Sequence, residues 1–91
     1  MITKDKLLEL GFKKQPNFTI MDSYIYDLGR NRELSYSCAE SPNEIVFINQ
    51  LNDYQDKSVD DVVVIHNYDY DGWMTEKKLK SLIFGLTGKK L

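Results

Sequence analysis

The run MTEKKLKSLIFGL, residues 74–86, carries the pattern that decides the fold. Large apolar side chains recur in it at i, i+3, i+4 and i+7, a spacing that gathers them on one stripe of a helix. The segments before this run alternate with a period of two, as strands do. The stripe is therefore expected to pack on one face of a sheet. Its members are Leu79, Leu82, Ile83 and Leu86.

Capping residues mark the ends of this helix and of a second, N-terminal one. Thr75 is expected to cap the start of the closing helix, and Gly88 to end it. Thr3 is expected to cap a short helix through Leu10, which Gly11 would end in a left-handed conformation. The buried side of this short helix is predicted to consist of Leu7, Leu8 and Leu10.

Four segments are predicted to be strands, at residues 18–28, 33–39, 44–51 and 62–65. The first reads as the longest strand, and turn residues at 29–32 join it to the second in a hairpin. The last is β-branched on both faces, which favours a strand covered on both sides or central in the sheet. Residues 13–17 read as a connector, and residues 52–61 as a polar loop.

These elements predict a single α+β domain over residues 1–91. We expect a four-stranded, mainly antiparallel meander, with the C-terminal helix on one face and the N-terminal helix at an edge or beside it. If one sheet face stays open, Tyr24, Tyr26 and Tyr36 are expected to be partly exposed there. Such a face would offer a surface for a homodimer.

The composition is that of a globular protein, with 42% hydrophobic and 29% charged residues among 91. No apolar run is long enough to span a membrane, and the N-terminus shows no secretory pattern, so we expect a cytoplasmic protein. Cys38 is the single cysteine, which excludes an internal disulfide.

The charges are unevenly distributed although the net charge is only −2. Residues 53–76 hold seven acids and one lysine, whereas residues 77–91 hold five lysines and no acid. Proteins that bind nucleic acid usually carry a dense basic face. This distribution argues against nucleic acid as the partner and favours solvated helix faces for the lysines.

Both ends of the chain resemble short uncharacterised proteins of bacteriophages and mobile elements. The C-terminal motif is Leu79-x-x-Leu82-x-Phe84-x-Leu86-Thr87-Gly88-x-x-Leu91, and the N-terminal motif is Thr3-x-x-x-Leu7-x-x-x-Gly11-Phe12-x-Lys14. The resemblance implies a phage or mobile-element accessory protein acting inside a bacterium. It carries over no functional residue.

The sharpest local motif is Asn67-x-Asp69-x-Asp71-Gly72. Oxygen ligands at positions 1, 3 and 5 with glycine at 6 are typical of a calcium loop. Its twelfth position, where such a loop carries a bidentate glutamate, is Lys78, and a strand rather than a helix precedes it. The motif is therefore interpreted as an acidic turn that leads into the closing helix, without a metal.

Few residues could support catalysis. His66 and Cys38 are each the only residue of their kind, and no third residue is indicated that would orient them as a nucleophile and base. A buried structural cysteine and a histidine at a strand end are favoured instead. The chain is predicted to be non-enzymatic and to need no cofactor.

Aromatic residues gather around the acidic loops, and they are the more informative signal. Tyrosine and tryptophan among polar residues are typical of binding hot spots, since they offer large rigid area with a polar tip. The competing interpretation is that they cover the sheet edge and seat the closing helix. The predicted partner-binding residues are Tyr54, Tyr68, Asp69, Tyr70, Asp71 and Trp73.

Three functions remain open from the sequence. The first is a protein-interaction module that binds or inhibits a host protein in an anti-defence role. The second is a binder that sequesters a nucleotide, with aromatic residues on the base and Arg30, Arg32 or lysines on phosphates. The third is a role linked to nucleic acid, by direct binding or by mimicry of DNA through the acidic loops.

Overall fold

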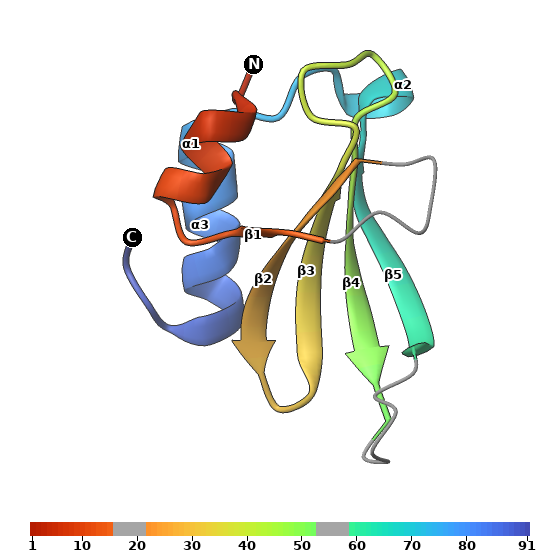
Figure 1. The fold of residues 1–91 in the computed structure, drawn as a ribbon, viewed down its shortest axis with the longest axis vertical. Coiled ribbons are helices and arrows are strands. Elements are labelled where there is room, and N and C mark those ends of the chain that lie inside the picture. The colour runs from red at the N-terminus through yellow and green to blue at the C-terminus, as the bar shows by residue number, and fades with distance from the viewer. Residues whose placement is uncertain (16–21, 53–58) are drawn as a thin grey trace.

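A five-stranded antiparallel sheet is the centre of the computed structural model, which describes residues 1–15, 22–52 and 59–91 (Figure 1). The strands follow one another in chain order, so the predicted α+β meander is confirmed. They are β1 (Lys13–Lys14), β2 (Ser23–Gly29), β3 (Arg32–Ser37), β4 (Ile45–Leu51) and β5 (Val59–Asn67). The expected number of four strands was one too few, because β1 arises from a segment predicted to be a connector.

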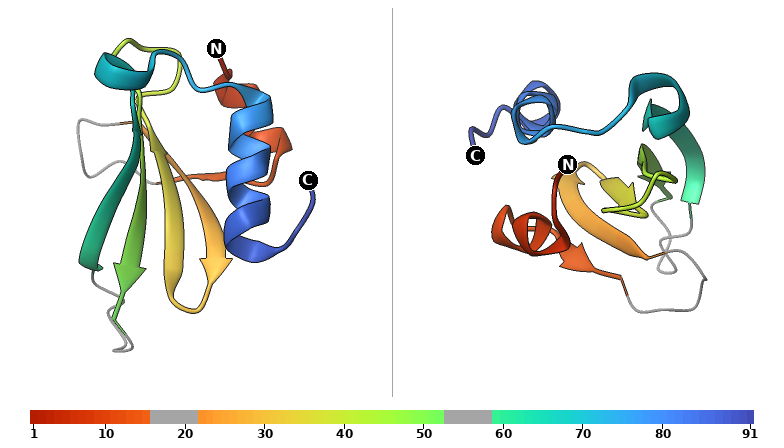
Figure 2. Two further views of the ribbon diagram at one scale, coloured as in Figure 1. Left: turned by 180° about the vertical axis from the view of Figure 1, so that it is seen from behind. Right: turned by 90° about the horizontal axis from the view of Figure 1, so that it is seen from above.

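The helices are α1 (Lys4–Glu9), α2 (Tyr68–Asp71) and α3 (Glu76–Thr87). Figure 2 shows α1 and α3 next to each other on the same side of the sheet, close to β2. An ion pair joins these two helices, with Lys6 Nζ 3.0 Å from Glu76 Oε1. The four-residue helix α2 lies at the end of the sheet where β5 finishes, in a segment that was predicted only as a turn.

The predicted N-terminal caps of α1 and α3 are confirmed. The hydroxyl of Thr3 accepts the N–H of Lys6, and that of Thr75 accepts the N–H of Lys78. Gly88 ends α3 with a φ of 74°, in the left-handed region that glycine adopts without a steric penalty. The expected burial of Leu8 was wrong, because this side chain points to solvent.

The core lies between the helices and one face of β2, β3 and β4. Cross-strand register aligns Tyr24 with Tyr36 and Tyr36 with Val46, and all three side chains are buried. The tyrosine face was expected to be partly open, and this was wrong for Tyr24 and Tyr36, whereas Tyr26 is half-buried. From α3, Leu79 and Ile83 complete the core.

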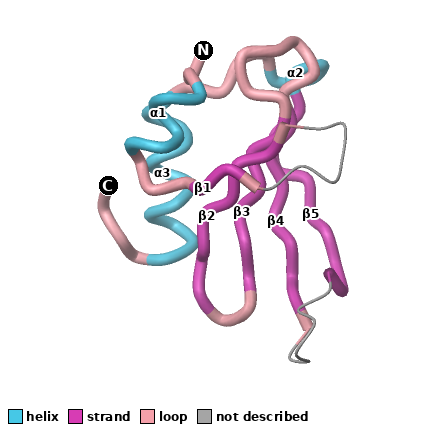
Figure 3. The backbone as a smooth tube through the Cα atoms, in the orientation of Figure 1, coloured by secondary structure: helices cyan, strands magenta, loops and turns pink. Residues whose placement is uncertain are grey.

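Strand β5 corrects two further expectations. At nine residues it is the longest strand among the described parts of the chain, and it forms an edge of the sheet rather than its centre (Figure 3). Its valines are exposed on both faces instead of covered. Of the strand predicted at 18–28, residues 23–28 lie in β2 and residues 18–21 lie outside the described ranges.

Cys38 does not belong to a strand. It lies directly after β3, has a φ of 57° and is half-buried. None of the helices in the described ranges is both long and apolar enough to cross a membrane.

Candidate functional site

Helix α2 is built by side chains that bond to its own backbone. Asn67 Oδ1 accepts the N–H of Asp69 at 3.0 Å, and Asp71 Oδ2 accepts the N–H of Asn67 at 3.0 Å. That backbone N–H lowers the pKa of Asp71, and the nearby charge of Lys78 lowers it further. The residues at positions 1 and 5 of the calcium-like motif thus serve as helix caps. Within residues 1–15, 22–52 and 59–91, no three His, Cys, Asp or Glu side chains are grouped so as to hold a metal.

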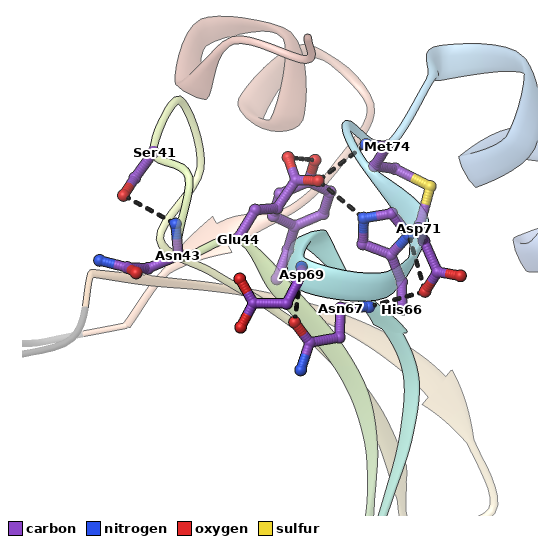
Figure 4. Close-up of polar contacts among 9 residues, drawn as sticks. Ser41, Asn43, Glu44, His66, Asn67, Asp69, Asp71 and Met74 are labelled. Carbon is purple, nitrogen blue, oxygen red and sulfur yellow. Dashed lines mark hydrogen bonds and ion pairs between the residues drawn. The ribbon is translucent and has the colours of Figure 1, made fainter.

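A buried carboxylate, that of Glu44, lies directly beneath α2 (Figure 4). Its Oε2 accepts the hydroxyl of Tyr36 at 2.5 Å. Its Oε1 lies 2.8 Å from Nε2 of His66 and accepts the N–H of Met74 at 2.7 Å. Because a buried polar group is costly unless it is hydrogen-bonded, these three contacts are what allow the carboxyl group of Glu44 at this position.

His66 connects this buried carboxylate to α2. Its ring is buried, and its Nδ1 lies 3.8 Å from Asp71 Oδ2 without a hydrogen-bond partner among the described residues. The backbone N–H of Tyr68 also donates to the carbonyl of Glu44, at 3.0 Å. Tyr68 at the start of α2 and Met74 shortly after its end therefore both hydrogen-bond to Glu44, which fixes the helix to the end of the sheet.

Tyr36 offers a test of this cluster by pH. Burial raises the pKa of Tyr36 well above its ordinary value, and the bond to Glu44 raises it further. The unfolded chain ionises Tyr36 near pH 10 while the folded chain keeps it protonated, so the free energy of unfolding should fall as pH rises above about 10. We expect Tyr36→Phe to flatten this fall in urea unfolding between pH 8 and 11. Tyr70→Phe, at an exposed tyrosine, should leave it unchanged; equal slopes in all three proteins would contradict the assignment.

Helix α2 and Trp73 just beyond its end present aromatic and acidic side chains, here called the α2 surface: Tyr68, Asp69, Tyr70, Asp71 and Trp73. Tyr70 is 88% exposed and Trp73 is 37% exposed. The rings of Tyr68 and Trp73 meet edge to face, with centroids 4.8 Å apart. This surface thus combines one freely projecting ring with a packed pair of rings beside two exposed carboxylates.

Five of the six predicted partner-binding residues are therefore brought together, and Tyr54 lies outside the described residues. The arginines of the nucleotide hypothesis are not near them within one chain. Arg30 lies in the turn between β2 and β3, at the opposite end of the sheet from α2 (Figure 1). The guanidinium of Arg32 donates to the carbonyl of Leu86 at 3.3 Å, which places it beside the end of α3.

Glu44 is the residue that sequence reasoning missed. It stands two and four residues before Val46 and Ile48, and this alternation places it in phase with the core side of β4. A glutamate in that phase, directly after a turn, was the available signal for a buried charge that needs donors.

No family model, curated protein or solved structure matches the chain.

Proposed function

We propose that this protein is a non-enzymatic protein-interaction module that binds its partner through the α2 surface. The observation that carries the proposal is Tyr70, an aromatic side chain left 88% exposed on a helix that is itself anchored to a buried cluster. Exposed aromatic residues supply the large, rigid contact area found at binding hot spots. A fixed backbone beneath them lowers the entropy lost on binding.

The chemistry of the α2 surface indicates the kind of partner. Asp69 and Asp71 are exposed and flank the rings, so a complementary surface would carry lysine or arginine around an apolar pocket. The resemblance of both chain ends to short phage and mobile-element proteins supports a partner in the cytoplasm of a bacterial host. We propose that the module binds such a host protein and thereby inhibits it.

The position of the single histidine also supports a non-enzymatic role. His66 lies between the carboxyl groups of Glu44 and Asp71, and the side chains of His66 and Glu44 are fully buried. A catalytic base must come within hydrogen-bond reach of the proton that it removes. The hydrogen bonds of Glu44 to His66, Tyr36 and Met74 are better accounted for as the support of α2.

Capture from bacterial lysate with Tyr70→Ala tests the proposal. The substitution should weaken binding of the captured host protein by about 30-fold or more, as loss of a hot-spot residue does. Phe84→Ala is the matched control, because Phe84 is another exposed aromatic residue but lies on α3. The measurement is mass spectrometry of retained proteins, followed by calorimetric titration of the purified partner.

Thermal unfolding must be the same in both variants, so that lost binding reports the surface and not the fold. Retention of the partner by Tyr70→Ala, or its loss in Phe84→Ala alone, would place the interface elsewhere. If neither variant nor the native chain retains a protein, the interaction module is the wrong class of function.

A further inference from the structure

Strand β5 is the last strand of the sheet in the described parts of the chain, and its edge is apolar and distinct from the α2 surface. Val62, Val63 and Val64 are 49%, 53% and 53% exposed. Protein sheets usually block such an edge with lysine, proline or a bulge, because it is a template for pairing with another strand. β5 contains neither lysine nor proline, and its two irregularities against β4 flank residues 61–64, which pair with β4 regularly. Over residues 61–64 the edge is therefore regular, and it is apolar at residues 62–64.

The backbone of β5 shows which residues could form the next ladder. The N–H of Val62 donates to Oδ1 of its neighbour Asp61, at 2.9 Å, so it is turned toward a local side chain rather than toward a strand. Alternate residues of an antiparallel edge strand turn their backbone groups outward. With Val62 in the outward set, Val64 belongs to it as well.

We propose that β5 pairs antiparallel with β5 of a second copy of this chain, about a two-fold axis at Val63. In this register Val62 bonds with Val64 of the second copy and Val64 with its Val62, which uses the outward groups of both strands. Val63 faces Val63 across the axis. A continuous sheet of both copies results, and the isologous contact closes on itself as a dimer.

The acidic residues favour a second copy in this register over other alignments of the same strand. Asp61 would face Ile65 of the second copy, so no two carboxylates are opposed. A parallel alignment in register would instead place Asp61 against Asp61, and like charges directly opposite destabilise a pair of strands. The Val62 N–H exchanges its bond to Asp61 for a ladder bond.

The dimer would present two α2 surfaces. Each α2 begins directly after β5, five residues beyond Val63, so with a rise of about 3.3 Å per residue the two helices would start roughly 30 Å apart at opposite ends of the new ladder. The inference goes beyond the proposed function, because it concerns another surface and holds whether or not α2 binds a host protein.

Sedimentation equilibrium of the purified native chain, and of two variants that place a charge at position 63, tests the pairing. We expect a dimer with a dissociation constant between about 1 μM and 1 mM, since a single strand pair is a small interface. Val63→Lys and Val63→Glu should each weaken it about tenfold or more, because the axis opposes identical charges. An equimolar mixture of the two variants should regain the dimer. Phe84→Lys, at a side chain also 53% exposed, should leave the native dimer intact.

The mixture separates loss of pairing from loss of folding, because unfolded chains would not recover a dimer when mixed. A native chain that stays monomeric up to about 1 mM would overturn the proposal. So would dimers that persist in either single variant, a mixture that stays monomeric, or loss of the dimer in Phe84→Lys. A monomer whose β5 becomes protected only when an extended peptide is added would show that the edge accepts a foreign strand instead.

Discussion

Replacement of Glu44 by alanine should lower the free energy of unfolding by about 3–5 kcal/mol, because it leaves several buried polar groups without a hydrogen-bond partner. The substitution removes the hydrogen-bond partner of the Tyr36 hydroxyl, of His66 Nε2 and of the Met74 N–H at once. Because small domains are stable by only about 5–15 kcal/mol, this is a large share of the total. Urea unfolding followed by circular dichroism measures it.

Two further variants test whether the loss of stability is specific to the buried carboxyl group of Glu44. Glu9→Ala removes an exposed carboxylate that pairs with Lys6 at 3.5 Å, so its stability should stay within about 0.5 kcal/mol of the native value. Glu44→Gln keeps the side-chain volume and one acceptor oxygen, so it should fold if alanine does not. In this variant the amide proton of Met74 should exchange with solvent faster. An unfolding midpoint of Glu44→Ala equal to that of Glu9→Ala would contradict the assigned role.

The caps and the meander could be predicted because their signals are local. Thr3 and Thr75 each act on an N–H three residues away, and the β2–β3 turn joins strands that are adjacent in sequence. Arg30 and Asn31 both have positive φ in that turn, as a two-residue hairpin of right-handed twist requires. Such features depend on a few neighbouring residues and can be read directly from them.

The cluster beneath α2 could not be predicted in the same way. Glu44 is 8 residues from Tyr36, 22 from His66 and 30 from Met74. No short motif links these four residues, and only the fold brings their atoms within bonding distance. The same reason explains β1, where two exposed lysines join the sheet through the register of β2 and not through any periodicity.

The run Val62-Val63-Val64 shows a different limit. A β-branched run is compatible with a central strand, buried on both faces, and with an open edge. Which of the two occurs depends on whether another strand follows in the sheet, and after β5 the chain turns into α2. The aromatic residues of α2 could be located from the sequence, whereas their exposure depends on the anchoring of this helix.

A substitution in the apolar stripe of α3 is expected to cause the second large loss in the free energy of unfolding. Leu79 and Leu82 both belong to the stripe, yet Leu79 is fully buried while Leu82 is half-buried at its margin. Leu79→Ala should lower the free energy of unfolding by about 2–5 kcal/mol, since it leaves a cavity between α3 and the sheet. Leu82→Ala should cost less than half as much, because solvent and neighbouring side chains can fill the space.

The two substitutions are matched, because both exchange leucine for alanine inside α3 and so change its helix propensity alike. The difference between them in urea unfolding therefore isolates burial. The dependence of the free energy on urea should stay the same in both, as expected when the core loses volume but the fold persists. Equal losses from the two positions would mean that α3 is seated on the sheet by its whole stripe rather than by the face that carries Leu79 and Ile83.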